Sequence, residues 1–183
     1  MEMKGKPVAA MTGTAWEYAS AIGQDSHRFC TPEEQAADPQ RQLVLGGLIL
    51  AGQLPLAGNS DADVVLHALT NAISGLSGVN ILGSRADQLC LQQGITDSVV
   101  YLREALATLD GWQLSHISVA VEGKRPRLEA HIAAIRHCLA ELAGLTDADV
   151  GLTATSGEGL TAFGRGEGLQ VFCQITARRP ENR

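Results

Sequence analysis

Residues 57–72 read AGNSDADVVLHALTNA, which places two aspartates just before an apolar run that contains a single histidine, His67. Ser60 is a good helix N-cap, and Asp63 stands at the capping-box position that follows it. We therefore expect a helix over residues 61–75, with its first-turn aspartates favoured by the helix dipole. Asp63 and His67 are spaced so that both project from one helical face. A histidine in that place is either a satisfied residue at the edge of the core or a ligand.

The composition indicates one globular domain. The chain has 183 residues, of which 45% are hydrophobic and 19% charged, and this suits one domain with a mainly aliphatic core rather than a disordered chain. The net charge of −6 argues against nucleic-acid or anionic-membrane partners, but it leaves room for a local basic pocket. We expect residues 1–15 to form a flexible extension and residues 16–183 to form the domain.

Cysteine usage and hydropathy predict a cytoplasmic location. The four cysteines are widely spaced and include no CxxC pair, so a zinc ribbon or a thioredoxin motif is not expected and reduced thiols are the default. No apolar run has the length of a transmembrane span, and the first seventeen residues lack the apolar core of a signal peptide.

Periodicity along the rest of the chain predicts strands mixed with helices in a mostly non-alternating order. Strands are expected at 19–22, at 42–50 as a hairpin, and at 114–121, 150–155 and 168–177. Helices are expected after Asp97 and from Pro126 onward, and residues 76–96 are expected to form a long loop. The predicted fold class is α+β, with one mixed sheet and about three helices on one of its faces.

The segment GQDSHRF (23–29) carries the first candidate chemical groups. Asp25 and His27 would point the same way on an extended strand. If His67 meets them in space, two imidazoles and one carboxylate leave a fourth position open on a divalent ion such as zinc, which is typical of catalytic metal sites. The alternative is a turn followed by a surface histidine.

Two further segments could bind anions. TATSGEGLTAFGRGEGLQVF (153–172) combines hydroxyls, a carboxylate and a guanidinium with glycines whose N–H groups could line a phosphate site. EGKRPRLEAH (122–131) is the densest basic run and lies at a predicted strand-to-helix junction, which is a natural anion site. The plainer alternatives are a flexible hairpin with an Arg165–Glu167 ion pair, and a solvated loop.

In order and spacing, these motifs resemble the 2-C-methyl-D-erythritol 2,4-cyclodiphosphate synthase family of non-mevalonate isoprenoid biosynthesis. The family's four motifs are matched here by GQDSHRF, Leu45-Gly46-Gly47, NSDADVVLHALTNA and TSGEGLTAFGRGEG, and the resemblance spans about residues 16–178. It implies a phosphorus–oxygen lyase that assembles as a homotrimer around a central channel, with active sites between subunits. In the reaction it implies, the 2-phosphate of a CDP-linked methylerythritol attacks the β-phosphorus of its own diphosphate, and CMP leaves.

The resemblance also implies which residues form the site. Zn²⁺, one per subunit, would be held by Asp25, His27 and His67, and Mg²⁺ or Mn²⁺ would be held with the diphosphate. The catalytic residues would be Ser156, Glu158 and Asn59. The substrate or CMP would be bound by Ser60, Asn80, Lys124, Arg125, Arg127, Leu128 and Thr155. The central channel would be lined by Gln24, Arg165 and Glu167.

Several positions depart from the family pattern, and none of them is a metal ligand. Asn59 stands in place of a histidine, Asn71 in place of an aspartate, and Gln24 in place of a phenylalanine. Asn-Ile-Leu at 80–82 stands in place of Asp-Ile-Gly, and the family's F-P-D-T-D loop has no match in residues 83–92. Two alternatives to the family reaction stay open: a paralogue that acts on another CDP-linked or phosphorylated substrate, and a non-catalytic trimer that binds a ligand.

Overall fold

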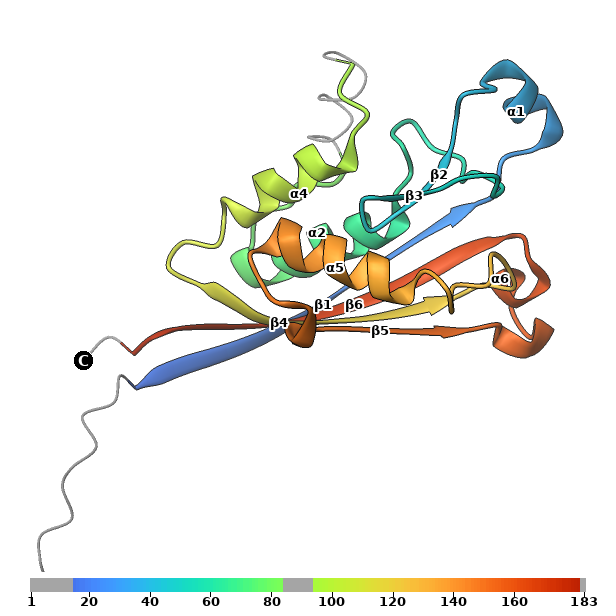
Figure 1. The fold of residues 1–183 in the computed structure, drawn as a ribbon. Helices are drawn as coiled ribbons and strands as arrows, with labels where there is room; N and C mark the ends of the chain where they lie inside the picture. Colours follow the sequence, from blue (N-terminus) through green and yellow to red (C-terminus); the bar gives the residue numbers. More distant parts are fainter. Residues whose placement is uncertain (1–14, 84–93, 182–183) are drawn as a thin grey trace, which may run out of the picture.

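The computed structural model describes residues 15–83 and 94–181, which form a sheet covered by helices on one face (Figure 1). The strands of the main sheet are, in spatial order, β1 (Trp16–Arg28), β6 (Gly168–Pro180), β4 (Gln113–Glu122) and β5 (Val150–Thr155). β6 is antiparallel to both β1 and β4, whereas β4 and β5 are parallel. The predicted α+β class with one mixed sheet is confirmed.

Helices and a small hairpin complete the described fold. The helices are α1 (Pro32–Ala37), α2 (Val64–Ser77), α4 (Ser98–Leu106), α5 (Ile132–Ala143) and α6 (Ala162–Arg165), with 3-10 turns η1 (Asp147–Asp149) and η2 (Gly157–Gly159). β2 (Leu43–Leu45) and β3 (Leu48–Leu50) form the hairpin predicted at 42–50. Within the described ranges, no helix is long and apolar enough to cross a membrane.

The core lies between the sheet and the helices, and strand alternation explains its composition. Every second residue of β6 is buried, from Leu169 through Val171, Cys173 and Ile175 to Ala177, because these side chains face the helices. The buried face of α2 packs over β1 and β6, and α4 packs on α2. Burying these aliphatic side chains supplies the main driving force for the fold.

β1 is longer than predicted. The strand expected at 19–22 is part of a longer one, because β1 runs from Trp16 through Gly23 to Arg28 and is paired along its whole length with β6. Gly23 does not end the strand because its neighbours on both sides keep their ladder partners on β6. The glycine has a different function here, which is to let a helix approach.

α2 begins later than predicted, and its cap is a different residue. The predicted helix over 61–75 with Ser60 as N-cap is wrong at its start: Asp63 caps a helix that begins at Val64. The Asp63 carboxylate accepts hydrogen bonds from the N–H groups of Val65 and Leu66, and also from Gly46 and Gly47 in the hairpin turn. Because Asp63 satisfies four backbone donors at once, it is the better cap.

Two other boundaries also differ. α5 begins at Ile132 rather than at Pro126, since residues 128–132 first form a tight turn in which the carbonyl of Leu128 accepts from the N–H of His131 and of Ile132. The loop predicted over 76–96 starts later, because α2 continues to Ser77 and ends at Gly78 in a left-handed conformation. Residues 84–93 of that loop, and 1–14 of the predicted extension, lie outside the described residues.

Candidate functional site

Close packing of α2 on β1 brings three polar side chains together. The residues of β1 that face the helix are first small, Ala19, Ala21 and Gly23, and then polar, Asp25 and His27. A Cβ atom at Gly23 would lie 2.2 Å from both the carbonyl oxygen of Ala68 and the backbone nitrogen of Ala72. Only glycine therefore allows this approach of the two backbones.

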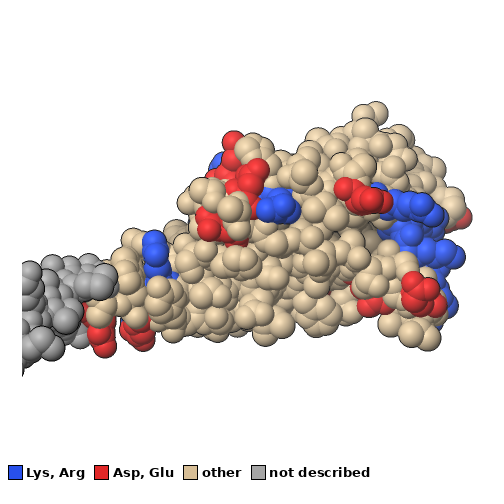
Figure 2. Space-filling model, turned by 60° about the horizontal axis from the view of Figure 1, so that its bottom comes forward, with Lys and Arg blue, Asp and Glu red and all other residues tan. Residues whose placement is uncertain are grey.

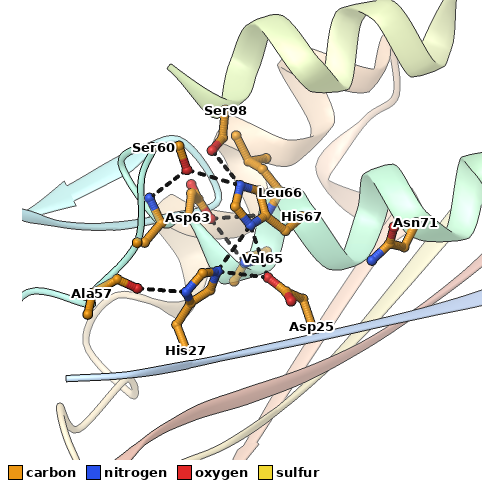
Figure 3. A network of polar contacts seen from close by, with 12 residues as sticks. Asp25, His27, Ala57, Ser60, Asp63, Val65, Leu66, His67, Asn71 and Ser98 are labelled. Carbon is orange, nitrogen blue, oxygen red and sulfur yellow. Dashed lines mark hydrogen bonds and ion pairs between the residues drawn. The ribbon is translucent and has the colours of Figure 1, made fainter. Parts of the chain in front are cut away.

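His67 projects from the first turn of α2 toward Asp25 and His27 (Figure 3). Its Nδ1 lies 3.0 Å from Asp25 Oδ2 and 3.2 Å from His27 Nε2, and the Asp25 and His27 atoms are 3.1 Å apart. Ligand atoms on a tetrahedral zinc ion, with bonds of about 2.0–2.1 Å, are separated by about 3.3 Å. The triangle therefore has nearly the size of one face of a metal tetrahedron, and the three residues form a possible metal-binding triad.

The chain fixes which nitrogen of His27 faces the triad. The backbone carbonyl of Ala57, which can only accept, lies 2.8 Å from Nδ1 of His27. Nδ1 therefore carries the proton, and the lone pair of Nε2 points at Asp25 and His67 (Figure 3). A lone pair and a carboxylate that point at one spot repel each other unless a cation lies between them, so the donor set fits a divalent metal.

The electrostatics of the triad favour positive charge. Burial raises the pKa of Asp25, but hydrogen bonds from the His27 and His67 rings, when these are protonated, outweigh burial and hold that pKa well below its usual range. Burial lowers the pKa of His27, but the hydrogen bond to Asp25 and its negative charge outweigh burial, so the net pKa is raised. A proton and a metal ion thus compete for the same place.

A loop held by one arginine supports the triad. The guanidinium of Arg41 donates to the carbonyls of Leu56, Gly58 and Ser60, which flank the Ala57 carbonyl that orients His27. Asn59 lies within this loop. No sequence motif identifies Arg41 as a supporting residue, because its three hydrogen-bond partners are backbone carbonyls of a segment distant in sequence.

Ser60, predicted to contact substrate, is buried in this monomer. Its hydroxyl oxygen accepts from the N–H of Ala62 and lies 3.4 Å from His67 Nε2 (Figure 3). A second serine, Ser98, lies closer to the same nitrogen at 2.9 Å. Ser98 carries no motif signal in the sequence, because it comes from the start of α4, far along the chain.

A separate pocket of about 670 Å³ lies beside β4 and β5. Its lining includes four of the residues predicted to bind the substrate, namely Lys124, Arg127, Leu128 and Thr155, and also Ser156, which was predicted to be catalytic. Arg125 makes other contacts: its guanidinium lies 5.2 Å from the centre of the Phe29 ring and donates to the carbonyl of Gly166. Lys and Arg side chains gather at the end of the molecule that carries α1 and α6 (Figure 2).

The remaining predicted residues lie apart from the triad. Glu158 is held in a left-handed conformation with φ of 49°, and its carboxylate accepts from the Ser156 hydroxyl at 2.9 Å. Arg165 and Glu167 form the predicted ion pair at 2.9 Å. Asn80 is exposed beyond the C-terminal end of α2, whereas His67 lies near its start, so the two are separated by most of the helix.

The triad and the pocket are carried by different strands of the sheet. β1, which carries Asp25 and His27, is one edge strand, and β5, which leads into Thr155 and Ser156, is the other. With strands about 4.8 Å apart, β1 and β5 are separated by about 14 Å. The pocket also includes Leu169 of β6, whose pairing partner on β1 is His27, so its lining extends from β5 toward the triad.

Comparison with known proteins identifies the family and supports the fold. The chain matches the YgbB family over residues 18–178. It is 48% identical to a 2-C-methyl-D-erythritol 2,4-cyclodiphosphate synthase of Chlamydia trachomatis, covering 88% of each chain. It superposes on a CDP-bound 2C-methyl-D-erythritol-2,4-cyclodiphosphate synthase with a TM-score of 0.68 and 28% identity, covering 87% of this chain and 99% of that one. It also superposes on the bifunctional IspDF of Campylobacter jejuni with a TM-score of 0.78 and 26% identity, covering 90% of this chain but only 43% of the bifunctional protein.

Proposed function

The chain belongs to the YgbB family and is an enzyme, and on that basis we propose that it forms a cyclic 2,4-diphosphate and CMP from a CDP-linked methylerythritol 2-phosphate. The observation that carries this proposal is the triad of Asp25, His27 and His67, whose ligand atoms are spaced as on one face of a metal tetrahedron. The reaction is an intramolecular phosphoryl transfer, so no side-chain nucleophile is required. Catalysis then consists of positioning and charge neutralisation.

Asp25, His27 and His67 hold one zinc ion per subunit in this proposal. Two nitrogens and one carboxylate oxygen suit zinc, and three protein ligands leave an open position for a phosphate oxygen. The bound ion supplies Lewis-acid stabilisation of negative charge on the phosphates. Glu158 holds Mg²⁺ or Mn²⁺ together with the diphosphate, since carboxylate and phosphate oxygens are the ligands such ions prefer.

The pocket beside β4 and β5 binds the CDP end of the substrate. Lys124 and Arg127 supply positive charge there, and Thr155 and Ser156 supply hydroxyl donors for phosphate oxygens. Leu128 contributes apolar surface for the base. A relative of the same fold has been solved in a CDP-bound form, which supports a nucleotide in this family's site.

A homotrimer completes the site. The face of the sheet opposite the helices exposes Tyr18, Ile22 and Phe172 at 62%, 66% and 42%, and its middle carries few charges (Figure 2). Large apolar side chains that share one exposed face indicate an interface. Packing these faces around a channel lined by Gln24, Arg165 and Glu167 would bring the triad of one subunit to the pocket of the next. A cytoplasmic location remains part of the proposal.

Neither alternative has a specific observation in its favour. A paralogue with another substrate would account for Asn59 and Asn80, but the 48% identity to a chlamydial synthase favours the family reaction. A purely binding trimer would not need a triad whose carboxylate and two imidazoles converge on one point.

The test is metal content measured together with turnover. Purified full-length protein is analysed for zinc, and is then incubated with Mg²⁺ and the CDP-linked methylerythritol 2-phosphate while CMP and the ³¹P spectrum of the cyclic product are followed. We expect about one zinc per subunit and stoichiometric CMP and cyclic diphosphate. Zinc-loaded trimer that releases no CMP would refute the proposed reaction, and the variant Asn59→His then shows whether the family's histidine restores it.

A further inference from the structure

Behind the triad, the second nitrogen of His67 has a partner from another helix. Nε2 lies 2.9 Å from the hydroxyl oxygen of Ser98, which is completely buried at the start of α4 (Figure 3). The Ser98 hydroxyl in turn donates to Oδ1 of Asp61, and the Ser98 backbone N–H donates to Oδ2 of the same carboxylate at 3.1 Å. The backbone N–H of Asp61 donates to the carbonyl of Thr96 at 2.8 Å, so Asp61 holds the start of α4 through three hydrogen bonds.

The donors and acceptors of this hydrogen-bond network favour one direction. An ionised carboxylate can only accept, so the single hydroxyl proton of Ser98 is directed to Asp61. The Ser98 oxygen is then left to accept from Nε2–H of His67. Because a neutral imidazole carries one proton, Nδ1 keeps its lone pair, and it is Nδ1 that lies 3.0 Å from Asp25 Oδ2.

Ser60 offers a competing arrangement. If its hydroxyl donated to Nε2, the proton of His67 would move to Nδ1 and would block the metal position. Ser60 lies at 3.4 Å from Nε2, whereas Ser98 lies at 2.9 Å, so the geometry favours Ser98 as the partner.

We propose that Ser98 and Asp61 are positioning residues, which keep His67 in the tautomer that binds metal through Nδ1 and thereby raise the zinc affinity of the triad. The proposal rests on the proposed metal role of His67 but not on turnover, because its readout is zinc affinity. Partners that orient a ligating histidine typically contribute about 10–100-fold in metal affinity.

A merely structural role is the alternative, because the same contacts also fix the start of α4. A structural role predicts that removing the Ser98 hydroxyl lowers the melting temperature of the metal-free protein and leaves the zinc affinity of the folded protein unchanged. A positioning role predicts a loss of zinc affinity that is larger than the loss of stability can explain. Zinc affinity and metal-free stability therefore have to be measured on the same variants.

The variants are Ser98→Ala, Ser98→Thr and the control Ser74→Ala, all in the full-length protein. Ser74 is a buried serine of α2 whose hydroxyl oxygen accepts from the N–H of Ile81 at 3.4 Å, so its removal deletes a similar hydroxyl on the helix that carries His67. Zinc dissociation constants come from competition with a chelator, and melting temperatures from the metal-free forms. We expect Ser98→Ala to weaken zinc binding by about 10–100-fold, Ser98→Thr to retain affinity within a few-fold, and Ser74→Ala to match the wild type.

Two results would overturn the proposal. One is a folded Ser98→Ala variant that binds zinc as tightly as the wild type, or that loses no more affinity than Ser74→Ala. The other needs no variant: ¹⁵N spectra of the histidine rings in the zinc-loaded wild type should show His67 protonated at Nε2. A spectrum that shows the proton at Nδ1 would exclude the proposed direction even if every Ser98 variant failed to fold.

Discussion

Replacing Gly23 by alanine should open the metal triad by a calculable amount. The new Cβ would lie 2.2 Å from the carbonyl oxygen of Ala68 and from the backbone nitrogen of Ala72, where ordinary contact begins at 3.4 Å. Both neighbours are backbone atoms, so no side chain can rotate away and α2 must move from β1 by about 1 Å. His67 precedes Ala68 and would move with it, whereas metal–ligand distances tolerate only about 0.2 Å. Zinc affinity should therefore fall at least as far as the ~10–100-fold typical of a lost orienting partner.

The same substitution should cost stability. Overpacking typically costs about 1–3 kcal/mol, which for a chain of this size lowers the melting temperature by roughly 2–12 °C. Gly75→Ala is a matched control, because Gly75 faces the same strand but its added Cβ would lie 3.7 Å from Ala21 Cβ, an ordinary contact. That variant should bind zinc normally and gain up to about 1 kcal/mol from helix propensity. A Gly23→Ala protein with wild-type zinc affinity, measured by chelator competition, would refute the claim that backbone approach sets the triad.

Three further predictions follow from the site and from the open face of the sheet. His67→Ala should purify without zinc, and a fully metallated variant, measured by elemental analysis, would contradict the ligand assignment. The raised pKa of His27 means that its ion pair with Asp25 stabilises the metal-free protein below about pH 6.5, and that this contribution is lost as pH rises through the raised pKa. The difference in free energy of unfolding between the metal-free wild type and His27→Asn should therefore shrink from pH 6 to pH 9. Over the same range the zinc affinity of the wild type should rise. A stability difference that stays constant with pH would contradict this prediction. Ile22→Asp should dissociate the proposed trimer in light scattering, whereas Ile49→Asp, which changes a 54%-exposed residue of the hairpin, should leave the mass of the wild type unchanged. Equal masses for the two variants would count against the proposed interface.

The triad was expected from the family resemblance, and local sequence patterns support parts of it. Asp25 and His27 are two residues apart, and alternation on a strand puts both on one face whatever else the chain does. His67 was assigned from a motif on a helix, and the helix was recognised by its apolar period. What the sequence did not reveal is the reason that the two elements meet, which is that Gly23 faces the backbone of α2.

The start of α2 shows why local signals can fail. Ser60 and Asp63 are both good caps, and the capping-box spacing favoured Ser60. The choice is made by Gly46 and Gly47, whose N–H groups point at the Asp63 carboxylate. No sequence pattern near Asp63 predicts these donors, because they come from a hairpin earlier in the chain. Ser98 and Arg41 went unpredicted for the same reason: their partners are distant in sequence and are in part backbone atoms.

One departure from the family pattern has a structural explanation in the contact between α2 and β1. Asn71, which stands in place of an aspartate, donates its side-chain amide to the backbone carbonyl of Gln24 at 3.0 Å and so ties α2 to β1. An aspartate could not make this bond, because a carboxylate and a carbonyl are both acceptors. Gln24 and Asn71 therefore reinforce the approach of helix and strand that positions the triad. The three candidate metal ligands match the family pattern, whereas Asn71, which departs from it, ties the helix that carries His67 to β1.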